Sequence, residues 1–297
     1  MSKQKILLTG AAGMLGSHLL KRVCAMERFE VFTIGRSSTS NGRNFISCDL
    51  TCLEQFDSII EQLRPNYVIH CAANVNVNAC EKDQENTYKL HVGTSSIIAS
   101  KPFIAKQIYI STDSVFDGTK GDYFAGDEKN PLNYYALTKS LGEDEFIKSK
   151  QNAIIIRTNI IGYTIPFKNS LFEWAYSSLK SGKAISGFSN IMFNPLYVKT
   201  LARLIVDVVL LNEIKKGVYH FGSSGYLSKY DFVQLVAQTF EFDSSLILPV
   251  SADREINGVK RPMNTTLNIE ETQNELGITF PGIEQELISI STDLKYA

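Results

Sequence analysis

The residues that decide the fold are Lys5-Ile6-Leu7-Leu8-Thr9-Gly10-Ala11-Ala12-Gly13-Met14-Leu15-Gly16, close to the start of the chain. The apolar run at 5–9 predicts a buried strand, and the stretch 17–26 after the glycines predicts a helix. A strand, a glycine turn and a helix in this order are the context of a dinucleotide fingerprint. Its glycines permit a tight turn, close approach of the backbone to a pyrophosphate, and packing of helix on strand. The N–H groups and dipole of the helix N-terminus then favour the anion.

Strand-like and helix-like segments alternate through the first half of the chain. Helices are predicted over 53–63, 85–100 and 134–148, between β-rich runs around Ile6, Val31, Phe45, Val68, Ile108 and Ile154. This alternation predicts a doubly wound α/β parallel sheet, the Rossmann fold. After Arg157, glycines and prolines interrupt the pattern. We therefore predict a dinucleotide-binding domain over 1–160 and a smaller, interleaved substrate lobe over 161–297, of which residues around 194–222 return to the first domain.

Several candidate residues follow the ends of predicted strands, which meet at one edge of a parallel sheet, where such folds bind ligands. The second strand ends in Gly35-Arg36-Ser37-Ser38. An acidic residue at this place would bind a ribose 2′-hydroxyl, whereas an arginine accommodates a 2′-phosphate. Arg36 therefore favours NADP(H), with NAD(H) as the alternative, although a plain surface charge is also compatible. The glycine turn, Arg36, Ser37, Asp49, Ala72 and Thr112 all fall at this edge.

A tyrosine and a lysine stand four residues apart in Asn133-Tyr134-Tyr135-Ala136-Leu137-Thr138-Lys139. On a helix, Tyr135 and Lys139 share one face. A free phenol has a pKa of about 10, and a neighbouring ammonium stabilises the phenolate, so we expect a lowered pKa for Tyr135. Lowering it by about 3 pH units requires roughly 4 kcal/mol. An exposed amphipathic pair has the same spacing, and the glycine turn upstream favours the catalytic interpretation.

With these motifs in place, the chain resembles the extended short-chain dehydrogenases/reductases, and among them the dTDP-4-dehydrorhamnose reductase (RmlD-like) group. The stretch Ser111-Thr112-Asp113-Ser114-Val115-Phe116-Asp117-Gly118 is close to the group's Ser-Thr-Asp-Tyr-Val-Phe-Asp-Gly. Cys48-Asp49-Leu50 matches its adenine-contacting Asp-Leu, and Cys71-Ala72-Ala73 its cofactor-lining Asn-Ala-Ala. The resemblance covers nearly the whole chain. It implies that the cofactor is bound by Gly10, Gly13, Met14, Leu15, Gly16, Arg36, Ser37, Asp49, Leu50, Ala72, Ala73, Tyr135 and Lys139.

The resemblance also implies a catalytic triad of Thr112, Tyr135 and Lys139 that reduces a carbonyl group. Tyr135 would deliver a proton to the carbonyl oxygen, Thr112 would donate a hydrogen bond to it, and Lys139 would steady the tyrosine and hold the nicotinamide ribose. These contributions grow as negative charge develops on the oxygen. The residues that the resemblance places near the substrate are Asn78, Asp113, Ser114, Asn194 and Arg261. A guanidinium such as that of Arg261 can grip a diphosphate, but a solvated basic loop is an equal alternative.

Departures from the family pattern leave the sugar open. Ser114 stands where the group has a tyrosine. The related 4,6-dehydratases have a glutamate at this position for the elimination of water, so Ser114 disfavours that reaction. The absence of cysteine beyond Cys80 disfavours epimerase–reductases. We predict an NADPH-dependent reductase of a nucleotide-diphospho-4-keto-6-deoxy sugar. The alternatives are an NADP-binding regulatory subunit resembling the methionine adenosyltransferase β subunit, and a sugar-nucleotide epimerase.

Composition adds a general class. The 297 residues include 30 basic and 31 acidic ones, so the net charge of -1 gives no electrostatic reason to bind nucleic acid or an acidic membrane. Five cysteines, an odd number, argue against a disulfide framework, and the four histidines lack the spacing of metal ligands, so no metal is expected. We recognise no signal peptide and no spanning segment. These features predict a soluble, cytoplasmic enzyme, with a homodimer as one option.

Overall fold

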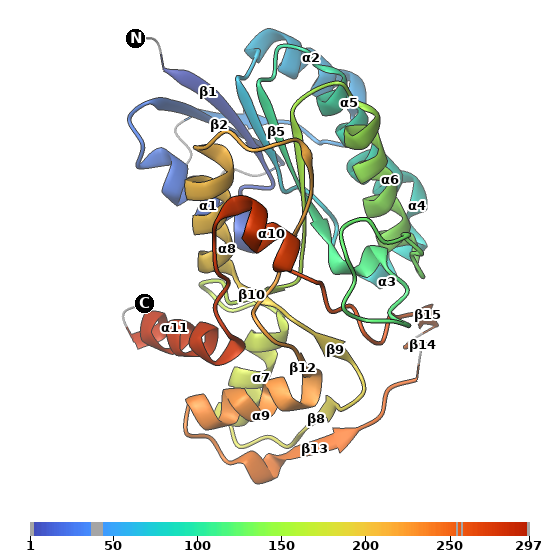
Figure 1. Cartoon of the computed structure of the whole chain (residues 1–297), viewed down its shortest axis with the longest axis vertical. Coiled ribbons are helices and arrows are strands. Elements are labelled where there is room, and N and C mark those ends of the chain that lie inside the picture. Colours follow the sequence, from blue (N-terminus) through green and yellow to red (C-terminus); the bar gives the residue numbers. More distant parts are fainter. Residues whose placement is uncertain (1–2, 37–43, 254, 257, 296–297) are drawn as a thin grey trace. The chain divides into compact units, whose positions relative to one another are not determined.

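The computed structural model, drawn in Figure 1, describes residues 3–36, 44–253, 255–256 and 258–295. Its internal contacts divide the chain into two compact units. The first consists of Met1–Val115, Pro131–Arg157 and Ala202–Tyr219. The second consists of Phe116–Asn130, Thr158–Leu201 and His220–Ala297.

A seven-stranded sheet forms the centre of the first unit, in the order β11-β6-β5-β4-β1-β2-β3. The strands are β1 (Gln4–Thr9), β2 (Phe29–Gly35), β3 (Asn44–Ser47), β4 (Tyr67–His70), β5 (Lys106–Thr112), β6 (Ala153–Thr158) and β11 (Gly217–Phe221). The pairings of β1 with β2 and β4, of β2 with β3 and of β4 with β5 are parallel. Every residue of β5 and β6 is buried, as expected of strands covered on both faces. The predicted doubly wound parallel sheet is confirmed.

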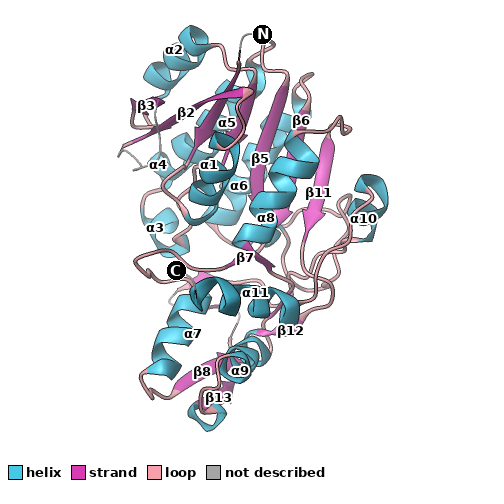
Figure 2. Cartoon of the chain, turned by 90° about the vertical axis from the view of Figure 1, so that its left-hand side faces the viewer, coloured by secondary structure: helices cyan, strands magenta, loops and turns pink. Residues whose placement is uncertain are grey.

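Helices cover both faces of this sheet, as Figures 1 and 2 show. On one face, α1 (Met14–Cys24) packs beside the π-helical segment η3 (Ile205–Leu210), and Arg22 forms an ion pair with Asp207. On the other face lie α2 (Leu53–Leu63), α5 (Thr94–Ser100) and α6 (Tyr134–Lys148). They share a core with the strands that includes Leu7, Phe56, Ile60, Ile98, Tyr109 and Phe146.

The single helix predicted over 85–100 is instead three consecutive segments: α4 (Gln84–Tyr88), the π-helical η1 (Lys89–Gly93) and α5. Two hydroxyl groups bond to backbone carbonyls at this irregular stretch, and such bonds compete with the helical hydrogen-bond pattern. The Thr94 hydroxyl donates to the carbonyl of Leu90 at 2.5 Å, and the Ser95 hydroxyl donates to that of His91 at 2.6 Å. π-Turns inside helices are rare and frequently occur at functional sites.

The second unit combines helices with short two-stranded pairs. Its helices are α7 (Leu171–Lys180), α9 (Lys229–Thr239), α10 (Glu270–Leu276) and α11 (Ile283–Lys295). Its strand pairs are β7 (Ile160–Ile161) with β10 (Leu196–Tyr197), β8 (Ile185–Phe188) with β13 (Ile247–Val250), β9 (Met192–Phe193) with β12 (Leu227–Ser228), and β14 (Glu255–Ile256) with β15 (Val259–Lys260). Capping boxes at Ser170 and Ser228 start α7 and α9, so these helix N-termini are locally encoded.

The boundaries of these units differ from the predicted domains at residues 116–130. Residues 116–130 were assigned to the first domain but belong to the second unit, because Tyr123 donates its backbone N–H to the carbonyl of Thr266 at 2.9 Å. Gly118, with φ +71, also lies very close to another segment of the second unit. A Cβ added to Gly118 would lie 2.5 Å from the backbone nitrogen of Met263. Residues 202–219, which lie inside the predicted stretch around 194–222, return to the first unit. Leu196 lies in the second unit, where its backbone N–H donates a hydrogen bond to the carbonyl of Asn159.

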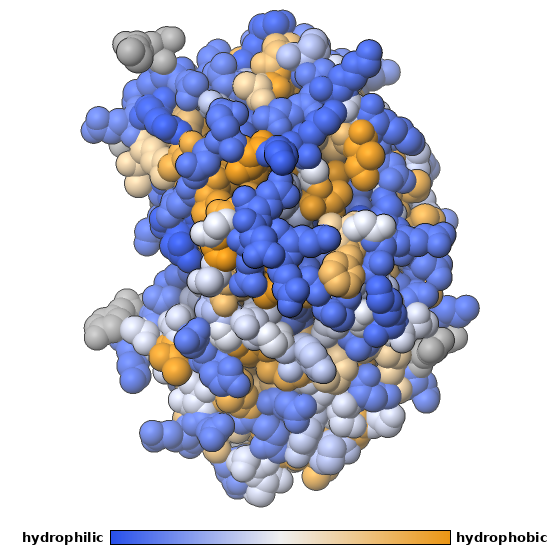
Figure 3. Space-filling view, viewed as in Figure 1, coloured by the Kyte–Doolittle hydropathy of each residue, from blue (hydrophilic) through white to orange (hydrophobic). Residues whose placement is uncertain are grey.

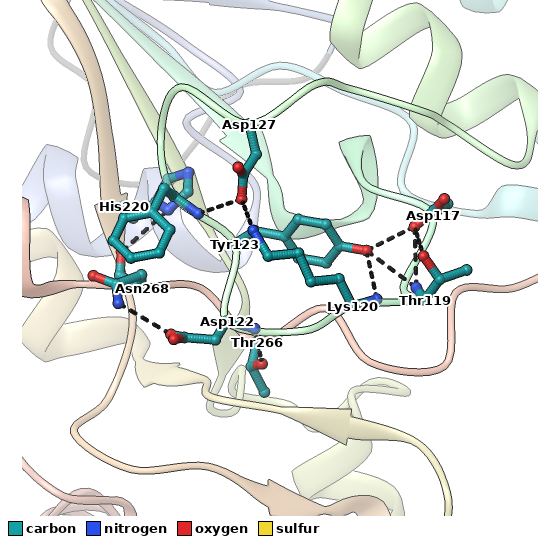
Figure 4. A network of polar contacts seen from close by, with 10 residues as sticks. Asp117, Thr119, Lys120, Asp122, Tyr123, Asp127, His220, Thr266 and Asn268 are labelled. Carbon is teal, nitrogen blue, oxygen red and sulfur yellow. Dashed lines mark hydrogen bonds and ion pairs between the residues drawn. The ribbon is translucent and has the colours of Figure 1, made fainter.

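A polar network organises the segment 116–130, as Figure 4 shows. The Asp117 carboxylate accepts hydrogen bonds from the Tyr123 phenol at 2.6 Å and from the Thr119 hydroxyl at 2.8 Å. Phe116 stacks on the Tyr123 ring with centroids 4.1 Å apart. These contacts stabilise the segment that follows β5 and the Ser111-Thr112-Asp113 motif in the sequence.

The molecular face in Figure 3 is mostly hydrophilic, with apolar residues scattered between polar ones. Among the residues that the structure describes, no helix has both the length and the apolar character required to cross a membrane.

Candidate active site

The helix that carries Tyr135 and Lys139 is fixed at its N-terminus by two side chains. Asn133 caps α6, since its side-chain oxygen accepts a hydrogen bond from the N–H of Ala136 at 3.0 Å. Glu81 of α3 (Val77–Lys82) accepts a second one from the N–H of Tyr134 at 2.7 Å. Caps of this kind satisfy helix N–H groups that have no intrahelical partner. The first turn of α6 is therefore held in one orientation.

Thr112 and Tyr135 are far apart in the sequence but interact in the fold. Thr112 is the last residue of β5, and its hydroxyl acts on the Tyr135 phenol in the direction that lowers the pKa of the phenol. The Thr112 hydroxyl also contacts the Asp113 carboxylate at 3.1 Å and accepts from the N–H of Ser114 at 3.2 Å. The strand end thus presents a hydroxyl to the phenol at the carboxyl edge of the sheet.

The expected lowering of the Tyr135 pKa is wrong. Burial raises the pKa of Tyr135 to about 12, against the opposing effect of the hydrogen bond with Thr112. The Lys139 ammonium donates to the carbonyl of Ile110 at 2.7 Å and lies 3.9 Å from the centre of the Tyr109 ring. Burial also lowers the pKa of Lys139 to about 7. Sequence spacing anticipated the shared helical face but not the desolvation, which disfavours both charged forms.

His91, which is not among the predicted site residues, is a neighbour of Tyr135. Its ring lies edge-on to the Tyr135 ring, with centroids 6.0 Å apart. Its Nδ1 pairs with the Thr138 hydroxyl at 2.8 Å, and its Nε2 accepts from the N–H of Asn74 at 2.9 Å. Burial lowers the pKa of His91 to about 3, which keeps the ring neutral and Nε2 an acceptor. His91 belongs to the π-helical segment η1, and its ring lies beside Tyr135. The regular helix predicted over 85–100 does not indicate this position.

The glycine turn packs so tightly that side chains would clash. A Cβ on Gly10, whose φ is +71, would lie 2.7 Å from the nitrogen of Ala72. A Cβ on Gly16 would lie 2.1 Å from the carbonyl oxygen of Gly10. The Gly13 N–H closes the turn onto the same oxygen at 2.9 Å, and α1 then begins at Met14. The turn and helix N-terminus thus form a close-packed backbone cradle of the kind that binds pyrophosphate.

A cavity of about 900 Å³ opens beside this cradle, entirely within the first unit. Its lining includes the predicted residues Gly10, Gly13, Arg36, Asp49, Leu50, Ala72 and Ala73. It also includes residues that we did not predict, namely Asp83, Asn86, Thr87 and Leu90. The α4–η1 region supplies these, and only its fold reveals them. Hydrogen bonds from Thr51 lower the pKa of Asp49, and the Arg36 charge adds a smaller lowering, so Arg36 and Asp49 interact across this wall.

The remaining cofactor candidates take other positions. Met14, Leu15 and Gly16 lie in the first turn of α1, and the Leu15 side chain is buried in the core. Thr112, Tyr135 and Lys139 are not among the described lining residues of the cavity. Ser37 lies outside the described residues.

The candidate substrate residues are divided between the two units. Asp113 is buried and accepts from the Ser114 hydroxyl at 3.2 Å, and Asn78 lies on α3. In the second unit, the Asn194 side chain donates one hydrogen bond to the backbone of Leu267 and accepts one from it, each at 2.9 Å. These bonds give Asn194 a structural role. Arg261 is half-buried, and burial lowers its pKa. A substrate contact by any of these residues stays a prediction.

Residues 4–295 match the family model described as the RmlD substrate binding domain. The chain belongs to this family. The predicted resemblance to the RmlD-like group of extended short-chain dehydrogenases/reductases is thereby confirmed.

Two kinds of relative are similar to the chain. A dTDP-4-dehydrorhamnose reductase from Aggregatibacter actinomycetemcomitans is 27% identical over 92% of this chain and 94% of its own length. The methionine adenosyltransferase 2 subunit beta of Mus musculus is 27% identical over 93% of this chain and 83% of its own length. Among solved structures, a dTDP-4-dehydrorhamnose reductase from Bacillus anthracis in complex with NADP has a TM-score of 0.84 at 23% identity and covers 99% of both chains.

Proposed function

We propose that this protein is an NADP(H)-dependent reductase of a nucleotide-diphospho-4-keto-6-deoxy sugar. One observation carries the proposal: the Thr112 hydroxyl lies close enough to the Tyr135 phenol to oppose the rise of its pKa, in the unit that also holds the glycine cradle and its cavity. Membership of the RmlD family and the similarity to dTDP-4-dehydrorhamnose reductases support it.

The cavity fits a nicotinamide dinucleotide. The backbone cradle at Gly10 and Gly13 suits the pyrophosphate, and the exposed Arg36 at the end of β2 suits a 2′-phosphate. When bound, NADPH would supply the hydride. Asp49 offsets part of the Arg36 charge, so NAD(H) is the alternative. The Bacillus anthracis neighbour, whose structure contains NADP, agrees with the preference for NADP(H).

The protonation state of Tyr135 suits reduction. With a pKa of about 12, the phenol is protonated at neutral pH, so it can donate a proton to a carbonyl oxygen. Thr112 would donate a hydrogen bond to the same oxygen as negative charge grows there, which favours the transition state over the ground state. Lys139, one helical turn from Tyr135, would supply positive charge near the phenol as its proton leaves.

The test is NADPH consumption with dTDP-4-keto-6-deoxy sugars, supplied as the direct ketone and as its epimerised form. Tyr135→Phe should lower turnover by about 10²- to 10⁴-fold, the usual contribution of a general acid, with NADPH affinity nearly unchanged. Tyr134→Phe is the matched control, because it removes a neighbouring phenol from the same helical turn. Tight NADPH binding without turnover of either ketone would contradict the substrate assignment.

The second candidate is an NADP-binding regulatory subunit. It is favoured by the similarity to the methionine adenosyltransferase β subunit, which is as high as that to the reductase. This role predicts a stable complex with a methionine adenosyltransferase catalytic subunit, and regulation of that partner that Tyr135→Phe leaves intact. A sugar-nucleotide epimerase would instead keep its cofactor through purification. The homodimer and the cytoplasmic location stay predictions.

A further inference from the structure

Glu143 lies on α6 one turn beyond Lys139 and two turns beyond Tyr135. Its carboxylate is completely buried and is gripped by Arg157 of β6, which is 2% exposed. Arg157 donates from Nε at 2.9 Å and from Nη2 at 2.8 Å, one bond to each carboxylate oxygen. The Ser111 hydroxyl of β5, next to Thr112, donates to the same carboxylate at 2.5 Å. This cluster therefore ties the catalytic helix to two strands of the sheet.

Stability alone is a weak reason for such a cluster. Burying two charges costs several kcal/mol for each ion, and apolar residues of similar volume are often as stable. A different reason is visible beside the pair, because Lys139 is a third buried ionisable group, 2% exposed. Burial lowers the pKa of Lys139, and among the effects that raise this pKa the negative charge of Glu143 is the largest.

We propose that Glu143 is a positioning residue whose carboxylate, oriented by Arg157 and Ser111, favours the charged form of the buried Lys139 ammonium one helical turn away. This proposal rests on the proposed function for its catalytic meaning. The effect of Glu143 on the charge of Lys139 does not depend on which reaction the protein catalyses.

The other groups around Lys139 cannot supply the negative charge. They are His70 on β4, Cys71 after β4, His91 on η1, Tyr109 on β5 and Tyr135 on α6. Burial raises the pKa of Cys71 to about 12 and raises those of Tyr109 and Tyr135, so these three groups are neutral at pH 7. Burial lowers the pKa values of both histidines, which are neutral as well. Among these described neighbours and Glu143, only Glu143 is an anion.

Arg157 serves a geometric purpose in this arrangement. Its bidentate grip fixes the plane of the carboxylate, which a single hydrogen bond would leave free to turn. Because Ser111 binds the same carboxylate, a shift of Glu143 would also disturb the strand end that presents Thr112.

The experiment is a titration of the protein with ¹³C-labelled lysine, followed by NMR, in which Lys139→Met identifies the Lys139 signal. In Glu143→Gln, we expect the midpoint of the Lys139 titration to fall by roughly one pH unit or more, because an opposing charge has been removed. Glu145→Gln makes the same chemical change on the same helix outside the cluster and should leave the midpoint in place. Glu143→Asp retains the charge and should restore much of the midpoint. A folded Glu143→Gln protein with an unchanged midpoint would overturn the proposal.

Glu143→Gln leaves Arg157 without its ion-pair partner, so a second variant guards against misfolding. The double variant Glu143→Gln/Arg157→Met removes both charges, and we expect a smaller fall of the Lys139 midpoint, because the lost positive charge of Arg157 partly offsets the lost negative charge of Glu143. No fall in a folded double variant would also overturn the proposal. If the reductase assignment is correct, the alkaline limb of the kcat profile of Glu143→Gln should move to lower pH by the same amount. Because the NMR titration uses no substrate, failure of the proposed function and failure of this inference give different results.

Discussion

The Glu81 carboxylate accepts a hydrogen bond of 2.7 Å from the backbone N–H of Tyr134. This contact joins α3, which carries Asn78, to the first turn of α6, which carries Tyr135. A carboxylate at a helix N-terminus satisfies an N–H group and also interacts favourably with the helix dipole. The candidate catalytic tyrosine is thus held by a residue that lies more than 50 positions upstream.

Replacing Glu81 should loosen that first turn. We expect Glu81→Ala to lower the free energy of unfolding by about 1–2 kcal/mol, since a charge-assisted hydrogen bond is lost. Urea denaturation measures this change. Glu85→Ala, which removes an exposed ion pair with Lys89, should cost less than about 0.5 kcal/mol. Equal losses in the two variants would show that the Glu81 contact is dispensable.

The glycine cradle should tolerate no side chain at Gly16. Its Cβ would lie 2.1 Å from the carbonyl oxygen of Gly10, so α1 or the turn must move. We expect Gly16→Ala to weaken NADPH binding by at least about tenfold, because displaced N–H groups no longer meet the pyrophosphate. Fluorescence titration measures the affinity. Gly126→Ala, whose Cβ meets no atom within 4 Å, should bind NADPH like the wild type.

The network in Figure 4 should make stability depend on acid pH. The hydrogen bond from Tyr123 and those from Thr119 lower the pKa of Asp117 from 3.8 to about 2. A lowered carboxyl pKa adds stability that is fully present above about pH 4 and is lost as the pH falls toward 2.

Asp117→Asn should therefore cost about 1–2 kcal/mol at pH 7, allowing for solvent screening, and the difference from the wild type should shrink below pH 4. Thermal unfolding at a series of pH values tests this. Asp253→Asn, at an exposed site, serves as the control. A pH-independent difference would mean that the Asp117 charge is not what stabilises the loop.

Lys106 should be needed for the folding of the first unit. Its side chain is 3% exposed, and its ammonium donates to the carbonyls of Val209 at 2.8 Å, Leu210 at 3.3 Å and Asn212 at 2.5 Å. Lys106→Met leaves these carbonyls at the end of η3 without that donor, and we expect a loss of about 2–4 kcal/mol in urea denaturation. The exposed Lys148→Met should have little effect. A stable Lys106→Met protein would indicate that water replaces the ammonium.

Much of the fold and part of the site were predictable because they depend on local patterns. The strand-glycine-helix sequence at 5–16 identified the cradle, and helices over 53–63 and 134–148 have the predicted bounds. The residues of the cavity wall were predicted only where they follow strand ends. Those from α4 and η1 were not predicted, because their approach to the cavity depends on how this irregular helical stretch packs in the fold and not on a local pattern.

The sequence by itself determined the features that arise from residues close together along the chain: the glycine cradle, the α/β alternation and the shared helical face of Tyr135 and Lys139. Only the tertiary structure decided which groups are charged. Burial raises the pKa of Tyr135 instead of lowering it, and Glu143 of α6 forms a buried ion pair with Arg157 of β6. The physical reason is that desolvation and ion pairing depend on contacts between distant segments, which periodicity and spacing do not specify.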